Sequence, residues 1–277
     1  MMRAGIVGWP VSHSLSPLLH GYWLKELGIA GEYVRLPAKP EEFQMVIARA
    51  RSEGFTGVNV TVPHKEAAFK IADTRDHAAV LARAANLLIF RPGGAMEAQN
   101  TDTYGLIQSL RQADISLTGK SVVMLGAGGA ARGAVLALNQ LGAAQIHILN
   151  RDPARAEALA GMLASNVTAK LLPGALSSWP LAAPDAALLI NTTSAGMKGN
   201  EPLDIDLSRL APAAVVYDIV YNPLVTPLLR DAGAHGHKTI DGLGMLMHQA
   251  VPSFEAFFGV TPKVTPGRRA ALEQALA

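Results

Sequence analysis

Short apolar runs rich in β-branched residues alternate with longer amphipathic stretches from the start of the chain. In the first part of the chain, the pattern predicts strands over 3–8, 33–37 and 57–62, and helices over 17–27, 41–52 and from residue 64 onward. Two more apolar runs, 86–91 and 96–99, are separated by Pro92-Gly93-Gly94 and predict a hairpin. Strands that alternate with helices favour an α/β fold with a mostly parallel sheet.

A second series of the same kind follows a linker over 115–120. It predicts strands over 121–125, 145–149, 188–191 and 215–219, and helices over 130–141 and 153–164. The stretch 244–258 predicts an amphipathic helix, and no strand follows it. We therefore expect two α/β domains: residues 1–103 plus 240–277 form one, and residues 104–239 form the other.

Composition narrows the classes of protein that this chain can be. Its 277 residues hold 24 Lys and Arg against 22 Asp and Glu, a net charge of +2, which is too little basicity for bulk nucleic-acid binding. Cysteine is absent, so disulfide scaffolds, thiolate metal sites and cysteine catalysis are excluded. Gly5, Gly8 and Pro10 interrupt the first apolar stretch, which is therefore unlike a secretory leader. The expectation is a cytoplasmic protein with no membrane segment that binds small molecules.

A glycine-rich segment directly follows the predicted strand 121–125 and opens the predicted helix 130–141. It reads Gly126-Ala127-Gly128-Gly129-Ala130-Ala131. Between a strand and a helix, such spacing is typical of a Rossmann-type dinucleotide-binding domain, in which glycines let backbone N–H groups approach a pyrophosphate at the helix N-terminus. The alternative is a plain glycine-rich turn between a buried strand and a packed helix.

The end of the next strand indicates which dinucleotide is bound. An acidic residue there would hold the ribose of NAD, whereas arginine suits the 2′-phosphate of NADP. Asn150 and Arg151 stand at this point, and Arg155 follows one helical turn later. Asp152 argues against NADP unless its carboxylate caps the helix that starts at Pro153, which is the interpretation we favour. We therefore predict NADP(H), with a solvated helix face as the alternative role for the arginines.

Three polar clusters lie where strands of the first domain end. They cover residues 12–17, 59–65 and 100–102. In the second cluster, Asn59 and Thr61 are two positions apart and would share one face of the strand, with Lys65 at the following helix start. Hydroxyls and amides beside one amine suit a polyol or hydroxy acid. Taken singly, Lys65 could be a surface charge, and Ser14 and Asp102 could be helix caps.

Eight motifs together resemble the shikimate dehydrogenase family, in the family's order and over nearly the whole chain. They are Gly8-Trp9-Pro10 with His13-Ser14-Leu15-Ser16-Pro17, Asn59-Val60-Thr61-Val62-Pro63-His64-Lys65, Asn100-Thr101-Asp102, Gly126-Ala127-Gly128-Gly129-Ala130, Asn150-Arg151, Asn191-Thr192-Thr193-Ser194-Ala195-Gly196-Met197, Asp218-Ile219-Val220-Tyr221-Asn222-Pro223 and Asp241-Gly242-Leu243-Gly244-Met245 with Gln249.

The resemblance implies reversible, NADPH-dependent reduction of 3-dehydroshikimate to shikimate, in the pathway to aromatic amino acids. It implies Lys65 and Asp102 as the catalytic pair. It further implies substrate contacts for Ser14 and Ser16 with the carboxylate, for Asn59, Thr61, Asn86, Asp102 and Gln249 with ring hydroxyls, and for Tyr221 nearby. The nicotinamide end would be lined by Thr192, Val220, Gly242 and Met245.

The chain departs from the family's pattern at Arg83, Leu87, Gln99 and Asp152. A quinate/shikimate or aminoshikimate dehydrogenase with broader substrate or NAD use therefore stays open, as does an NADP-binding regulatory protein that has lost catalysis. His235-Gly236-His237 lacks a third nearby ligand, so no metal is expected. The sequence also leaves a homodimer open.

Overall fold

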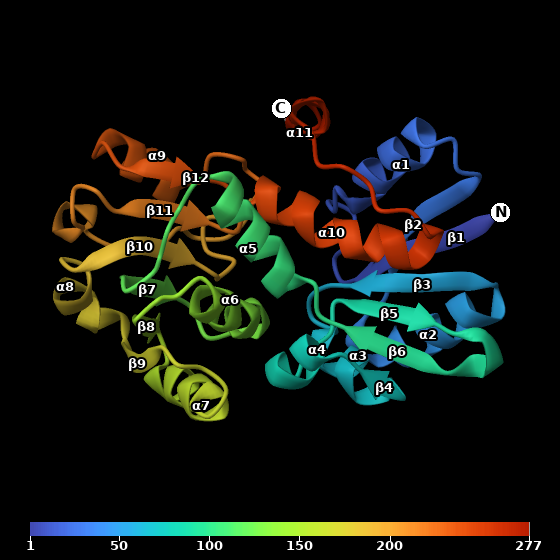
Figure 1. Cartoon of the computed structure of the whole chain (residues 1–277), viewed down its shortest axis with the longest axis horizontal. Coiled ribbons are helices and arrows are strands. Elements are labelled where there is room, and N and C mark those ends of the chain that lie inside the picture. The colour runs from blue at the N-terminus through green and yellow to red at the C-terminus, as the bar shows by residue number, and fades with distance from the viewer. Residues whose placement is uncertain (277) are drawn as a thin grey trace. The chain divides into compact units, whose positions relative to one another are not determined.

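The computed structural model describes residues 1–276, and these residues divide into two units. The first unit holds Met1–Gly105 and Leu246–Ala275, and the second holds Leu106–Met245. The chain passes from one to the other within helix α5 (Asp102–Gln112) and returns within helix α10 (Leu243–Phe258) (Figure 1). The three polar clusters of the sequence therefore lie in the first unit, and the glycine-rich segment lies in the second.

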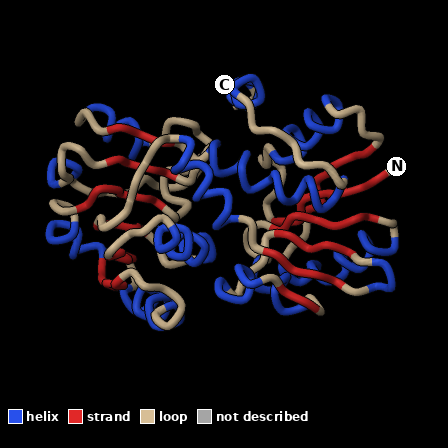
Figure 2. The backbone as a smooth tube through the Cα atoms, viewed as in Figure 1, coloured by secondary structure: helices blue, strands red, loops and turns tan. Residues whose placement is uncertain are grey.

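The first unit is built on a six-stranded sheet in the order β2-β1-β3-β5-β6-β4. Its strands are β1 (Met2–Gly8), β2 (Gly31–Pro37), β3 (Phe55–Val60), β4 (Thr74–Arg75), β5 (Leu87–Phe90) and β6 (Met96–Gln99). β1 runs parallel to β2 and β3, while β5 pairs antiparallel with both β3 and β6. In Figure 2 the strands of this sheet are the red segments of the unit that carries the N-terminus. The predicted hairpin is therefore confirmed.

The helices of the first unit include the predicted ones and two that the sequence did not predict, α4 and α11. They are α1 (Ser16–Glu26), α2 (Phe43–Ser52) after a 3₁₀ turn (Pro40–Glu42), α3 (Lys65–Ile71), α4 (His77–Ala82) and α11 (Pro266–Gln274), with a further 3₁₀ turn at Pro92–Gly94. The two-residue strand β4 and the six-residue helix α4 are too short to show a period in the sequence.

Several predicted strand boundaries differ from the structure by one or two residues, and one of these differences bears on the site. The strand predicted over 57–62 ends at Val60, because Thr61 and Val62 leave it in a turn whose carbonyl at Thr61 accepts from the N–H of His64 at 2.9 Å. Thr61 therefore does not share a strand face with Asn59. Its side chain packs beside Gly8 at the end of β1.

The second unit is a fully parallel six-stranded sheet in the order β12-β11-β10-β7-β8-β9. Its strands are β7 (Ser121–Leu125), β8 (Gln145–Asn150), β9 (Lys170–Ala175), β10 (Ala186–Asn191), β11 (Val215–Asp218) and β12 (Lys238–Ile240). The chain moves outward from β7 to β9 and then resumes at β10 on the other side of β7 (Figure 1). This is the order of a Rossmann fold, whose ligands bind where the direction reverses.

Helices of the second unit connect these strands. They are α6 (Gly129–Gln140), α7 (Pro153–Leu163), α8 (Trp179–Ala182) and α9 (Pro227–Ala234), with 3₁₀ turns at Leu176–Ser178 and Leu207–Arg209. All five residues of the central strand β7 are buried, which explains its continuous apolar sequence. Across residues 1–276, no helix has the length and apolar character needed to span a bilayer.

His20 on α1 is completely buried in the first unit, and neither ring nitrogen has a hydrogen-bond partner. Its ring stacks on Tyr33 with centroids 3.9 Å apart. Burial lowers the pKa of His20 to about 3, so the folded protein holds it neutral over a range in which the unfolded chain would protonate it.

We expect this histidine to weaken the protein in acid. Because its folded pKa lies below its unfolded value near 6.5, stability falls as pH drops below 6.5, by about 2 kcal/mol at pH 5. Asp218, whose pKa burial raises to about 6, acts in the opposite direction, so the comparison must be with a His20→Leu variant in which Asp218 is unchanged. Urea unfolding at pH 7 and pH 5 measures this effect. Between the two pH values, the free energy of unfolding of the wild type should fall by about 2 kcal/mol more than that of the variant. Equal losses would contradict the low pKa of buried His20.

Candidate active site

Lys65 is the first residue of α3 and follows the turn that leaves β3. Its Nζ lies 2.6 Å from Oδ2 of Asp102, and the lysine side chain is 18% exposed. Helix N-termini disfavour cations, so helix stability does not explain a lysine in the first turn of α3. The ion pair with Asp102 does explain it, and the residual exposure leaves the amine within reach of a ligand.

Asp102 is buried at the start of α5, and both of its carboxylate oxygens are engaged. Oδ2 accepts from Lys65, and Oδ1 accepts from Nδ2 of Asn86 at 2.8 Å. Its backbone N–H donates to the side chain of Asn100 at 3.1 Å, and Asn100 in turn donates to the carbonyl of Ala84 at 2.9 Å. The carboxylate is thus fixed in direction, with the positive end of a helix beside it.

Asn86 ties the same cluster to two other segments. Its Oδ1 accepts from the backbone N–H of Thr101 at 2.8 Å, and its Nδ2 also lies 3.1 Å from Oε1 of Gln249 on α10. The Thr101 hydroxyl donates to the carbonyl of Gln249 at 2.8 Å. Lys65, Asn86, Asp102 and Gln249 therefore form one hydrogen-bonded group.

Asn59 lies beside this group but is only 5% exposed. Its Nδ2 donates to the carbonyl of Asn86 at 3.0 Å and to the hydroxyl of Ser253 at 2.8 Å, while its Oδ1 accepts from the hydroxyl of Tyr33 at 2.8 Å. Both amide hydrogens are used within the protein. A ligand hydroxyl could therefore only donate to the remaining lone pair of Oδ1.

The Ser14–Ser16 segment forms the start of α1, which begins at Ser16 followed by Pro17. Ser14 is not an N-cap by position, since Leu15 occupies it, but its Oγ accepts from the backbone N–H of Ser16 at 3.2 Å. Burial raises the pKa of Tyr33, and the nearby Ser16 side chain partly opposes that rise. The Tyr33 hydroxyl itself donates to Asn59.

The glycine-rich loop of the second unit follows β7 at the point where the strand order reverses. Gly126 has φ of +109°, and a Cβ there would come within 2.8 Å of Thr192 Oγ1, so only glycine fits. Gly128 and Gly129 are different, because a Cβ on either would meet no atom within 4 Å. Gly128 caps α6 without any side-chain hydrogen bond. The loop, including Ala127 and Ala130, therefore leaves open space before free helix N–H groups, which suits a pyrophosphate.

The residues at the end of β8 and just after it suit a separate phosphate group, such as the 2′-phosphate of NADP. Asp152 accepts from the backbone N–H of Ala154 at 3.1 Å and is the N-cap of α7, which confirms the capping role predicted for it. Asn150 donates to the carbonyl of Asp152 at 2.8 Å. Arg151 and Arg155 are exposed, and the described residues place no carboxylate within ion-pair distance of either. Two uncompensated guanidinium groups are consistent with a 2′-phosphate.

The four residues expected at the nicotinamide end belong to the second unit. Thr192 follows β10 and donates to the carbonyl of Leu125 at 2.8 Å. Val220 follows β11, and its carbonyl accepts from the N–H of Gly242 at 3.2 Å. A Cβ on Gly242 would lie 2.0 Å from the Ile219 carbonyl oxygen, so the backbone is closely packed there. Met245 is half-buried on α10.

Buried Asp218 supports these cofactor-side loops. Its Oδ1 accepts from Asn191 Nδ2 at 2.9 Å and from the N–H of Val220 at 3.0 Å, and its Oδ2 accepts from the Thr226 hydroxyl at 2.7 Å. Tyr221, which the resemblance places near the substrate, is half-buried and also lies in the second unit. The other residues expected at the substrate all belong to the first unit, and Tyr221 stays a prediction.

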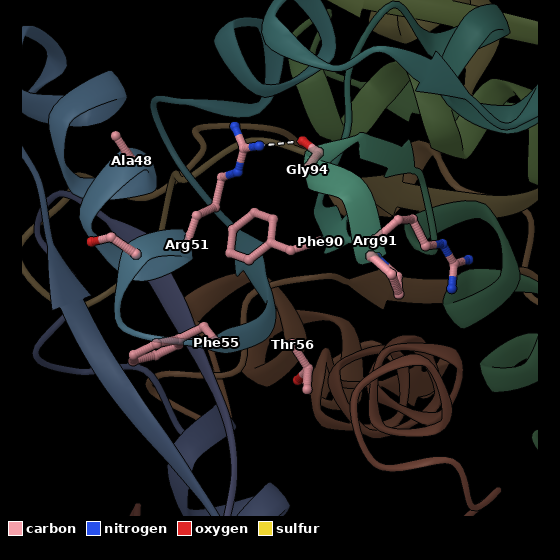
Figure 3. Close-up of a pocket in the computed structure, with 9 residues that line it drawn as sticks. Ala48, Arg51, Phe55, Thr56, Phe90, Arg91 and Gly94 are labelled. Carbon is pink, nitrogen blue, oxygen red and sulfur yellow. Dashed lines mark hydrogen bonds between the residues drawn. The ribbon is translucent and has the colours of Figure 1, made fainter.

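A surface hollow of about 640 Å³ lies at the opposite end of the first unit's sheet, where β3 begins and β5 ends. The Arg51 guanidinium crosses it to donate to the carbonyl of Gly94 (Figure 3). Arg91 on its rim pairs with Glu97 at 2.6 Å. None of the predicted site residues lines this hollow, and its arginines already have acceptors, so it is separate from the lysine–aspartate pair.

Sequence reasoning missed three residues that support the site: Tyr33, Arg35 and Ser253. Tyr33 and Arg35 stand two positions apart in a strand that was predicted, so they share one face, and this was an available signal. Ser253 had no such signal, because it reaches Asn59 from 194 positions away along the chain.

Comparison with known proteins agrees with both units. Residues 6–88 match the model of the shikimate dehydrogenase substrate binding domain, residues 108–196 that of shikimate / quinate 5-dehydrogenase, and residues 242–272 that of the shikimate 5'-dehydrogenase C-terminal domain. A shikimate dehydrogenase (NADP(+)) of Paramagnetospirillum magneticum is 47% identical over 272 residues, covering 96% of each chain.

Two solved structures are similar over the whole chain. Shikimate 5-dehydrogenase from Thermus thermophilus, in complex with NADP(H) and shikimate, is 32% identical with a TM-score of 0.87 and 100% coverage of both chains. Quinate dehydrogenase from Corynebacterium glutamicum, in complex with NAD, is 28% identical with a TM-score of 0.89 and 98% coverage of both chains. Since family models and full-length relatives agree with the two-unit fold, this chain belongs to the shikimate dehydrogenase family of NADP-dependent oxidoreductases.

Proposed function

We propose that the chain catalyses the reversible NADPH-dependent reduction of 3-dehydroshikimate to shikimate, on the route to aromatic amino acids. The observation that carries this proposal is the Lys65–Asp102 pair, 2.6 Å apart and surrounded by amides and hydroxyls that suit a polyhydroxylated ring. Turnover of shikimate with NADP, followed by the absorbance of NADPH, tests it directly.

Lys65 handles the proton in this mechanism. NADPH, when bound, supplies the hydride. As the ketone carbon is reduced, negative charge develops on its oxygen, and the ammonium of Lys65 stabilises that charge and donates a proton to it. In the reverse direction the neutral amine accepts the proton of the hydroxyl. Asp102 holds the lysine in place through Oδ2.

Binding of the ring is assigned to the side chains around this pair. We propose that Ser14 and Ser16 hold the carboxylate and that Thr61, Asn86, Asp102 and Gln249 meet the hydroxyls, with Asn59 offering one acceptor lone pair. Tyr221 is the remaining residue that we propose for the substrate. The first unit (Met1–Gly105 and Leu246–Ala275) would then be the substrate domain and the second (Leu106–Met245) the NADP domain. The boundary expected at 239/240 would cut strand β12 (Lys238–Ile240), so it moves to α10.

The cofactor is assigned to the second unit by its glycine loop and its arginines. Gly126, Gly128 and Gly129, with Ala127 and Ala130, would hold the pyrophosphate through backbone N–H groups at the start of α6. Arg151 and Arg155 would hold the 2′-phosphate, with Asn150 fixing the turn. Thr192, Val220, Gly242 and Met245 would contact the nicotinamide end.

Arg151→Ala should raise KM for NADP roughly 20-fold, because a charge-assisted bond to a phosphate is lost. KM for NAD, which has no 2′-phosphate, should change less than twofold. Arg209→Ala, which removes another exposed arginine of the same unit, is the control and should leave both constants unchanged. Equal effects of Arg151→Ala on NADP and NAD would show that the arginine does not recognise the 2′-phosphate.

A broader quinate/shikimate or aminoshikimate dehydrogenase is the second candidate, because the chain departs from the family's pattern at Gln99 and Arg83. Steady-state kinetics of shikimate and quinate against NADP and NAD separate the two. Efficient turnover of quinate, or of NAD, would favour the broader enzyme. A protein that binds NADPH but turns over neither substrate would be the regulatory alternative.

The cytoplasmic location and the homodimer left open by the sequence are predictions as well. Fractionation of cells that produce the protein tests the location. Sedimentation velocity tests the homodimer, because a dimer of this 29.1 kDa chain would sediment with twice the mass of the monomer.

A further inference from the structure

Strand β2 presents two polar side chains on one face to the start of α1. The hydroxyl of buried Tyr33 donates to Asn59 at 2.8 Å, near the Ser16 side chain. Arg35, two positions further along, donates from Nη2 to the backbone carbonyl of Ser14 at 2.7 Å. Alternation along a strand places both side chains on the same side. The guanidinium of Arg35 is thus fixed beside the two serines proposed to hold the substrate carboxylate.

Apart from Arg35, the side chains described around Ser14–Ser16 offer little positive charge for a carboxylate. The serines are neutral, and Lys65 is already paired with Asp102. Arg35, by contrast, has no carboxylate within ion-pair distance among residues 1–276. The first turn of α1 carries no acidic residue, and the helix presents its positive end there. Arg35 is therefore an uncompensated cation that is hydrogen bonded to the Ser14 backbone.

We propose that Arg35 is a specificity-determining residue that supplies the positive charge for recognition of the substrate carboxylate at Ser14 and Ser16. This inference rests on the proposed function, since it assigns a partner to the carboxylate of that substrate. Arg35 holds the Ser14 backbone through one N–H group, so its charge lies beside this segment. It does not touch the reacting carbon, so its effect falls on binding and not on the chemical step.

Two other cations near this end of the sheet must be distinguished from Arg35. Lys39 lies two residues beyond β2, and its Nζ is 5.7 Å from the centre of the exposed Trp9 ring. His13 is exposed in the loop before Ser14. Neither is hydrogen bonded to the Ser14–Ser16 segment, so Lys39→Gln is a matched control that removes one positive charge nearby without removing that contact.

The test compares shikimate with its methyl ester, which has the same ring without the negative charge. Arg35→Gln keeps a side-chain amide that can donate to Ser14, and Arg35→Lys keeps the charge. We expect Arg35→Gln to raise KM for shikimate roughly 10-fold at low salt, with kcat within twofold. Arg35→Lys should stay within roughly threefold, and Lys39→Gln within roughly twofold, of the wild type. The inhibition constant of the ester should be unchanged in all three variants.

Salt provides a second measurement. Because the guanidinium is exposed, ions screen its attraction, so KM for shikimate should rise with ionic strength in the wild type and much less in Arg35→Gln. If Arg35→Gln weakens acid and ester equally, or weakens neither, the inference is overturned. If the wild type itself neither turns over shikimate nor binds it, the proposed function fails first, and the inference fails with it.

Discussion

Replacement of Lys65 by alanine should lower kcat roughly 1,000-fold while KM for shikimate changes less than threefold. The amine is needed where charge develops on the oxygen, which happens in the transition state and not in the bound substrate. Removal of a group that acts at that point lowers kcat and kcat/KM together. Steady-state kinetics of shikimate oxidation and of 3-dehydroshikimate reduction would measure both constants. Unchanged turnover would remove Lys65 from the mechanism.

A second variant is needed because the first leaves a buried carboxylate without its cation. Asp102 is only 5% exposed, and an unpaired buried charge can destabilise the whole fold. Lys65→Arg keeps the positive charge, but a guanidinium does not release a proton near neutral pH, so this variant should fold as the wild type does and still lose most of kcat. Urea unfolding of both variants separates lost chemistry from lost structure.

The sequence predicted the central strands of both sheets for a physical reason. β7 and β10 are buried along almost their whole length, and such strands show as continuous apolar runs. The glycine loop was also predictable, because Gly126 has a positive φ and a close contact with Thr192 that no other residue tolerates. The role of Asp152 followed from its place directly before Pro153, and the hydrogen bond to Ala154 confirms it.

The two edge strands of the second sheet and the short edge strand β4 of the first could not be predicted in the same way, although the other edge strand, β2, was predicted. β12 is three residues long, and β9 contains Pro173 and Gly174, which usually mark a loop. Edge strands pair on one side only and need little apolar sequence. Their presence is decided by the neighbouring strand, which the local pattern does not contain.

The candidate site shows the same division between local and distant information. The Lys65 helix start and the Asn100–Asp102 segment were visible as polar residues at strand ends. The contacts that orient them come from far along the chain, as when the side chain and carbonyl of Gln249 meet Asn86 and Thr101. Only the family resemblance, and not the spacing of residues, pointed to that glutamine.

Gly128→Ala should leave the fold intact and yet weaken NADPH binding roughly 100-fold. At Gly128 φ is −93°, which alanine adopts without strain, and an added Cβ meets no atom within 4 Å. The free energy of unfolding should therefore change by less than about 1 kcal/mol. The same methyl group would stand in the space before the α6 N-terminus, where the pyrophosphate must come close to the backbone.

Gly242→Ala is the contrasting variant in the same unit. Its Cβ would lie 2.0 Å from the carbonyl oxygen of Ile219 and 2.8 Å from the carbonyl carbon of Val220, so backbone has to move and about 3 kcal/mol of stability should be lost. Urea unfolding and NADPH fluorescence titration, applied to both variants, give two independent readings. Gly128→Ala should alter only the second, since its space is reserved for a ligand. If it destabilised the fold and bound NADPH normally, the loop would be a packing turn and the cofactor would have to be held elsewhere.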